Sequence, residues 1–61
     1  MIKLGDILMS PKWIQQGLTQ ILIVTHIINE EVCYAKDPNM MTYHVMVNED
    51  IKVIGSINNT H

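Results

Sequence analysis

The chain has 61 residues, of which 48% are hydrophobic, and a formal net charge of −2. This length allows one domain at most, and a domain of this size buries only about 60% of the surface that its unfolded chain exposes. Four lysines and no arginine stand against six acidic residues. Arginine is the residue that most often makes paired hydrogen bonds to phosphate and guanine. Its absence, together with the negative net charge, argues against binding of a nucleic-acid polymer.

The sequence also limits where the protein can reside. Cys33 is the single cysteine, so the chain cannot form an internal disulfide. No apolar stretch reaches the roughly 18 residues that a membrane span needs. The amino terminus lacks the apolar run and small-residue cleavage site of a secretory signal. We therefore expect a cytoplasmic protein with no membrane partner.

The first half of the chain contains strand signals and a competing helix signal. Residues 3–8 predict an opening strand, and Ser10-Pro11 is typical of a helix start. Gly17 and the β-branched run that follows it disfavour a long helix. We expect at most one short helical turn near residues 11–16, and then the longest strand, residues 18–28.

The second half alternates short strands with polar turns. The turn residues are asparagine, aspartate, glutamate and proline, which favour turn conformations. Residues 41–47 alternate cleanly, with Tyr43 and Val45 on one face. The predicted strands are residues 32–35, 41–47 and 51–54, and the predicted turns are residues 29–31, 37–39 and 48–50. A polar tail, residues 56–61, follows a domain of residues 1–55.

Five short strands separated by polar turns predict an all-β domain, a small five-stranded antiparallel barrel. The opening KLGDI (residues 3–7), a loop with Trp13 and Gly17, a three-strand meander and a last strand ending VIG (residues 53–55) resemble the SH3-like small barrels. The chain lacks the acidic loop and the aromatic row of proline-binding SH3 domains. The resemblance therefore implies the fold and not proline-peptide binding.

The possible metal ligands and nucleophiles do not form a motif. His26, Cys33, His44 and His61 are too far apart in sequence for the short paired spacing of structural zinc sites, so we expect no metal site and no cofactor. Cys33 with His26 or His44 as its base would need a cleft that excludes water. A barrel of this size has room for little beyond its own side chains, so we expect no enzyme and assign Cys33 to the core.

Five residues are candidates for binding. Trp13 and Lys12 lie together in a predicted loop, where the tryptophan either fixes the loop to the barrel or anchors a partner. If the ligand is a nucleotide, Trp13 or Tyr34 could stack on the base while Lys12 or Lys36 binds a phosphate. His44 joins them as a half-exposed strand residue.

The run of residues 21–28 is apolar on both faces of the predicted strand. A monomeric barrel would leave one of these faces uncovered, which is an aggregation hazard. We therefore expect a homodimer or a higher oligomer.

Met40 and Met46 are poorly placed for the core, and methionine suits adaptable surfaces.

These observations predict a non-enzymatic interaction module that self-associates and that binds and inhibits a partner protein through Trp13 and neighbouring loops. Abundant isoleucine and asparagine without arginine indicate an AT-rich genome. Free-standing barrels of this length are frequent in phage and accessory elements, so the resemblance implies such an origin. The alternative is a small-molecule binder that sequesters a nucleotide-type signal in a pocket between subunits.

Overall fold

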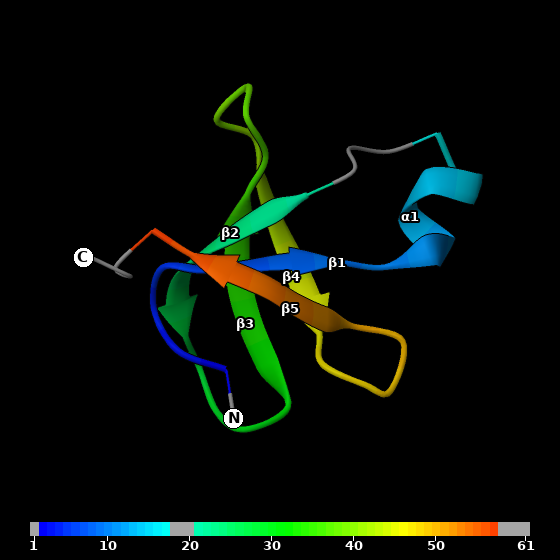
Figure 1. Ribbon diagram of the computed structural model, residues 1–61. Coiled ribbons are helices and arrows are strands. Elements are labelled where there is room, and N and C mark those ends of the chain that lie inside the picture. Colours follow the sequence, from blue (N-terminus) through cyan, green and yellow to red (C-terminus); the bar gives the residue numbers. More distant parts are fainter. Residues whose placement is uncertain (1, 18–20, 58–61) are drawn as a thin grey trace.

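The computed structural model describes residues 2–17 and 21–57. It confirms the predicted all-β class, because five antiparallel strands form one sheet beside a single short helix (Figure 1). The elements are β1 (Asp6–Met9), α1 (Pro11–Gln15), β2 (Leu22–Ile27), β3 (Val32–Lys36), β4 (Thr42–Met46) and β5 (Lys52–Ser56). Residues 18–20 of the predicted long strand, most of the predicted tail, and His61 lie outside the described residues.

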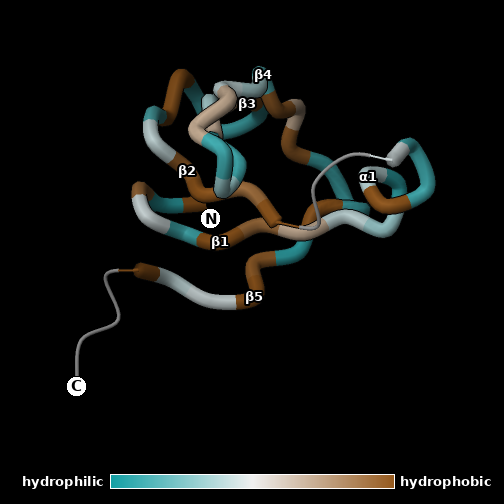
Figure 2. Tube along the Cα trace, turned by 90° about the horizontal axis from the view of Figure 1, so that it is seen from above, coloured by the Kyte–Doolittle hydropathy of each residue, from teal (hydrophilic) through white to brown (hydrophobic). Residues whose placement is uncertain are grey.

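The strands follow the order β4-β3-β2-β1-β5 in the sheet. Register shifts in the β1–β5 and β2–β3 pairs bend the sheet, as bulges do. As a result, β3 and β4 lie on one side and β1 and β5 on the other (Figures 1 and 2). This arrangement is consistent with the SH3-like resemblance.

The five strands do not close into a complete barrel, because the sheet stays open. The chain after β4 leads β5 to the far side of β1, so β4 and β5 form the two opposite edges. Within the described residues, β4 pairs with β3 alone and β5 with β1 alone. The fold is therefore a strongly curled sheet with two open edges.

The core is small and lies between the two sides of the curled sheet. It consists of six buried side chains: Leu8, Leu22, Val24, Cys33, Ala35 and Val45. Cys33 is only 1% exposed, which confirms its predicted place as a small core residue. Trp13 and Tyr43 pack against this cluster from its rim and stay half-buried.

The start of the domain differs from the predicted strand of residues 3–8. Lys3 begins a turn, because the Asp6 carboxylate accepts its backbone N–H at 2.8 Å and Gly5 has a φ of 85°. The strand begins only at Asp6. This positive φ is accessible to glycine at little cost, and it directs the chain into β1.

The predicted helical turn is confirmed. Ser10 is the N-cap of α1, its Oγ accepting the backbone N–H of Lys12 at 3.3 Å, and Pro11 occupies the first turn. Gly17, with a φ of 77°, follows the helix end. Among the described residues, no helix is long and apolar enough to cross a membrane.

The run of residues 21–28 is buried at its start and exposed at its end, and the edge strand β5 also carries exposed apolar side chains. β2 is paired on both sides, by β1 and β3, and its inward residues Leu22 and Val24 are buried. In β5, by contrast, Val53 and Ile54 are each about half exposed, and Ile57 follows at 60%. Apolar side chains are therefore uncovered both at the edge strand β5 and at Ile27 and Ile28, the end of the predicted run.

Candidate functional site

A groove of about 270 Å³ lies between α1, β4 and the loop that joins β4 to β5. Leu22 and Val45 of the core line it, as do the half-buried rings of Trp13 and Tyr43. The groove is thus an extension of the hydrophobic core to the surface, at the open side of the sheet.

The groove runs along the edge of β4. Four consecutive residues, Tyr43, His44, Val45 and Met46, line it. Since consecutive side chains of a strand point to opposite faces, a groove that touches all four follows the strand's edge and not one of its faces. Within the described residues β4 pairs only with β3, so this edge offers backbone groups to a further strand.

Tyr43 is held in place by Asp37. The tyrosine hydroxyl donates to Asp37 Oδ2 at 3.0 Å, and Asp37 Oδ1 accepts the backbone N–H groups of Asn39 and Met41 at 2.9 Å each. The hydrogen bond from the Tyr43 hydroxyl to Asp37 is the largest cause of a raised Tyr43 pKa, followed by burial and by the charge of the carboxylate. The phenol therefore stays protonated at neutral pH, and the wall of the groove is fixed by the turn between β3 and β4.

On the other side of the groove, Lys12 joins α1 to the β4–β5 loop. Its Nζ lies 2.8 Å from Asp50 Oδ2. The hydrogen bond to Asp50, together with the charge of the carboxylate, raises the pKa of Lys12. Both side chains are largely exposed, at 66% and 45%, so water screens the pair and it contributes little stability.

The structure brings together three of the five predicted binding residues. Trp13, Lys12 and His44 line the groove. Trp13 packs against the core and also lines the groove, so it fixes α1 to the domain, while its role as an anchor for a partner stays a prediction. Tyr34 and Lys36 do not line the groove.

Tyr34 and Lys36 lie on the outer face of β3. There Tyr34 stands between His26 of β2 and His44 of β4, its paired neighbours. The rings of Tyr34 and His44 have centroids 5.5 Å apart at an angle of 57°. Of the alternatives predicted for a base and phosphate site, Trp13 with Lys12 therefore lies at the groove, and Tyr34 with Lys36 lies on a different surface.

Sequence reasoning missed Tyr43 and Asp50 as groove residues. The alternation in residues 41–47 assigned Tyr43 to the core, and it does pack there, but its ring also reaches the open side. Asp50 was read only as part of a polar turn. A signal for Tyr43 was available in Asp37, six residues earlier, which is a suitable acceptor across a β3–β4 hairpin.

A second pocket, of about 260 Å³, lies at the end of the core near Ile2, Ile27 and Val47, with Cys33 at its base. Burial raises the pKa of the Cys33 thiol, so it remains protonated at neutral pH and is a poor nucleophile. Within residues 2–17 and 21–57, no three or more His, Cys, Asp or Glu side chains come together as metal ligands.

Comparisons of this chain with protein-family models, with curated proteins and with solved structures found no match. The groove geometry and the two sheet edges are therefore the basis for assigning a function.

Proposed function

We propose that this protein is a non-enzymatic interaction module that binds, and thereby modulates, a partner protein through the groove between α1 and β4. The observation that supports this most directly is that a groove with Trp13 and Tyr43 in its lining follows the open edge of a strand. Such an edge accepts an extended segment by strand addition, in which main-chain hydrogen bonds supply affinity and side-chain pockets supply specificity.

The groove suits the side chains of such a segment. Its volume of about 270 Å³ is below the roughly 300–1,000 Å³ of pockets that enclose a drug-sized ligand. An apolar side chain of the added strand would enter between Trp13 and Tyr43 and cover Leu22 and Val45. Tryptophan and tyrosine are frequent energetic anchors of protein interfaces, because they bury a large area with few rotatable bonds.

The proposal is tested by selecting peptides from a randomised display library against the protein and titrating the selected peptides. Trp13 is the only tryptophan, so its fluorescence reports directly on occupancy of the groove. We expect selected peptides to change this fluorescence and to slow amide hydrogen exchange in β4.

Trp13→Ala should weaken binding at least tenfold, measured with a fluorescent label on the peptide because this variant has no tryptophan. A matched variant on the same helix is the control. Ile14 is 51% exposed and does not line the groove, so Ile14→Ala should bind as the parent protein does. Failure of the library to yield any peptide that protects β4 would overturn the proposal.

The nucleotide alternative rests on Trp13 and Lys12, which do lie together at the groove. Lys12 is already bonded to Asp50, and a carboxylate beside the groove repels phosphate. We therefore propose the protein partner first. A purified protein that carries a compound absorbing near the nucleotide maximum would reverse this order.

Self-association is also part of the proposal, and we place it at the edge of β5. This strand exposes Val53 and Ile54 and contains no proline, and Lys52 is its single charge. Two copies of β5 in antiparallel pairing would cover Val53 and Ile54 of both chains about a twofold axis. Sedimentation should show a dimer. Ile54→Lys should dissociate this dimer, and Ile14→Lys, a change on α1, should leave it intact. A parent protein that is monomeric at micromolar concentration would overturn the proposed dimer.

Inhibition of the partner, and an origin in a phage or accessory element, remain predictions from the sequence.

A further inference from the structure

The hydrogen bonds between β3 and β4 determine which backbone groups of β4 face the open edge of the sheet. Just before β4, the N–H of Asp37 donates to the carbonyl oxygen of Met41 at 3.0 Å, and just after it the N–H of Val47 donates to that of Glu31 at 2.7 Å. In an antiparallel pair, residues that bond to the neighbouring strand alternate with residues whose backbone groups point away from it. Both bonds join odd-numbered residues, so the odd-numbered residues of β4 direct their backbone groups to β3.

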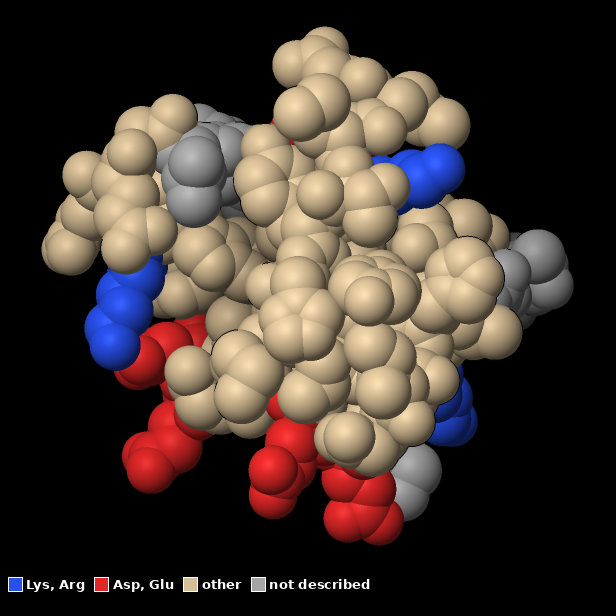
Figure 3. All heavy atoms as spheres, turned by 180° about the vertical axis from the view of Figure 1, so that it is seen from behind, with Lys and Arg blue, Asp and Glu red and all other residues tan. Residues whose placement is uncertain are grey.

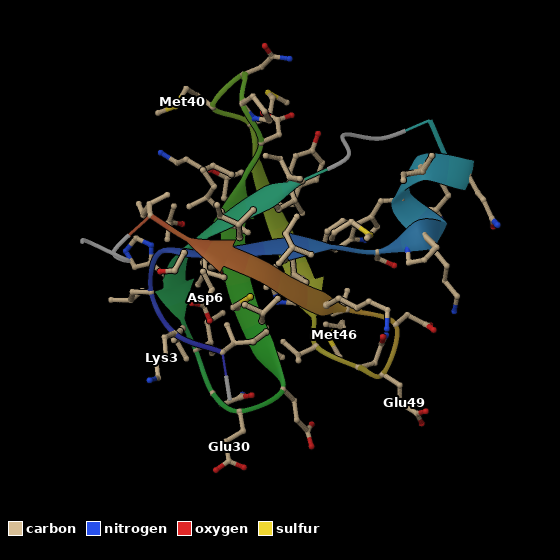
Figure 4. All side chains as sticks on the ribbon, in the orientation of Figure 1. Lys3, Asp6, Glu30, Met40, Met46 and Glu49 are labelled. Carbon is tan, nitrogen blue, oxygen red and sulfur yellow. The ribbon has the colours of Figure 1, made fainter. Side chains whose placement is uncertain are left out.

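The other residues of β4 direct their backbone groups to the open edge. They are Thr42, His44 and Met46, which alternate with Tyr43 and Val45 in the pairing with β3. Each offers one N–H donor and one C=O acceptor. In the part of the chain that the structure describes, no strand lies beyond β4, and Figure 4 shows Met46 where the strand meets the β4–β5 loop. An added strand would therefore bond to these three residues.

The same alternation divides the side chains of an added strand between two surfaces. Tyr43 and Val45 pack in or against the core, whereas Thr42, His44 and Met46 are exposed on the outer face of the sheet. Side chains that lie side by side on neighbouring strands point to the same face. Every second side chain of the segment would thus lie on the groove side, and the side chains between them would lie on the outer face.

The outer face of β2, β3 and β4 has basic side chains and no carboxylate from these strands. The three strands contain His26, Lys36 and His44 but no aspartate or glutamate. Lys36 and His44 lie on the outer face, because they alternate with the buried Ala35 and Val45. Figure 3, the view from behind, shows the acidic side chains gathered toward one edge of the molecule. An acidic side chain on an added strand would complement the charge of Lys36.

Lys36 lies beside β4 at the end where this strand begins. It pairs with Thr42 at a position without exchanged hydrogen bonds, where side chains approach closely. Because Thr42 is short and exposed, the four-carbon stem of the lysine can extend across it to a further strand. Among the described residues Lys36 forms no ion pair. The other end of β4 differs, because Met46 pairs there with Val32, which follows Glu31.

We infer that the segment that binds β4 carries an aspartate or glutamate on its outward face, opposite Thr42, where Lys36 reaches it. The inference rests on the proposed strand addition at β4. Apolar side chains occupy the alternate positions, on the groove side beside Trp13. Backbone bonds to Thr42, His44 and Met46 set the register, and the lysine selects among the segments that fit. The partner is therefore a protein with an extended stretch of alternating apolar and polar residues that is acidic at one outward position.

The test uses the same randomised display library with the parent protein and three variants. Lys36→Gln removes the positive charge and Lys36→Glu reverses it. Lys3→Gln is the matched control, because it removes the same charge from the turn before β1. We expect peptides selected by the parent and by the Lys3 variant to be enriched in aspartate and glutamate at one outward position. This enrichment should disappear with Lys36→Gln and change to lysine and arginine with Lys36→Glu.

Titrations make the same test quantitative. A cross-strand pair of opposite charges is worth roughly two- to fivefold in affinity, so Lys36→Gln should bind a selected acidic peptide about two- to fivefold more weakly. Lys36→Glu should weaken binding further, because like charges then face each other, and Lys3→Gln should bind as the parent does. These differences should shrink at high salt.

Amide hydrogen exchange resolved by residue separates this inference from the proposed function. Binding should newly protect the N–H groups of Thr42, His44 and Met46, since those of Tyr43 and Val45 already point to β3. Peptides that protect these three groups yet show no acidic preference would overturn the inference and leave the proposed function standing. A library that yields no peptide protecting them would overturn both.

Discussion

At the scale of single residues, Asp37 contributes more to the fold than its place in a turn suggests. Its carboxylate accepts two backbone N–H groups and the hydroxyl of Tyr43 while it is 7% exposed. Hydrogen bonds to charged groups contribute about 1.5–3 kcal/mol, and their loss leaves buried donors unsatisfied. A domain of this length has a total stability of only roughly 3–9 kcal/mol.

Asp37→Ala should therefore lower the free energy of unfolding by about 2–3 kcal/mol, measured from the midpoint of urea unfolding. Tyr43→Phe, which removes one of the three bonds, should lower it by about 1 kcal/mol. Asn39→Ala is the control, because its exposed side chain lies in the same turn. Equal midpoints for the Asp37 and Asn39 variants would contradict this account of the turn.

Tyr43 also predicts how stability depends on pH. Its pKa is raised in the folded state, first by the hydrogen bond to Asp37, so the unfolded chain loses the phenol proton at a lower pH than the folded protein does. The stabilisation is therefore complete below the ordinary tyrosine pKa of about 10 and is lost as pH rises through the folded value.

The free energy of unfolding should fall between about pH 9 and pH 12, and less steeply in Tyr43→Phe. Burial also raises the pKa of Cys33, so Cys33 too makes the free energy of unfolding fall as pH rises, beginning at a lower pH. Because Cys33 is present in both proteins, the difference between their two slopes isolates the contribution of Tyr43. Urea unfolding across this range measures both slopes. Identical slopes would show that the bond to Asp37 does not perturb Tyr43.

At the scale of elements, the two ends of the α1 segment are set by local chemistry. Ser10 and Pro11 start the helix, and Gly17 redirects the chain after it with a φ of 77°. A side chain at this φ is strained although nothing lies within 4 Å of the added Cβ. Gly17→Ala should thus cost about 1 kcal/mol, seen in the midpoint of urea unfolding.

Gly55 is the matched control for this change. Its φ is outside the left-handed region, and an added Cβ would lie 3.6 Å from Ile7 Cδ1, which is an ordinary contact. Gly55→Ala should stay within about 0.5 kcal/mol of the parent protein. A larger loss for Gly55→Ala than for Gly17→Ala would mean that packing, and not backbone conformation, decides the tolerance of both sites.

The same local chemistry explains which parts of the fold could be predicted. Asp37 and Asn48 close turns with their own side chains, so the turns after β3 and after β4 could be predicted from residue type. The helical turn followed from Ser10 and Gly17 in the same way. The later start of β1 could not, because it depends on the bond from Lys3 N–H to Asp6.

Longer-range features carried weaker sequence signals. The register shift after Val24 places His26 opposite Tyr34, which strict alternation does not predict. The groove depends on the order of strands in the sheet, because it forms where β4 is left at an edge next to α1. The sequence could name Trp13 and Lys12, which line the groove, as candidates for binding, but it could not distinguish Tyr43 from a core residue.

At the scale of the whole molecule, the proposed dimer predicts that thermal stability depends on concentration. Association adds to the stability of the folded chain in proportion to the logarithm of concentration. In a domain of this size 1 kcal/mol shifts Tm by about 4–8 °C, so a tenfold rise in concentration should raise Tm by several degrees. Ile54→Lys should have a Tm that does not change with concentration. A constant Tm in the parent protein would argue against association through β5.

The positions of β4 and β5 at opposite edges have a consequence for binding strength. A dimer joined through β5 would keep both β4 edges at its outer ends, so it could hold two segments of one target at once. The second contact would then be intramolecular, and avidity could exceed the affinity of one groove by about 10²–10⁴-fold without any new contact. A target that presents the segment in two copies would thus be preferred over one that presents it once.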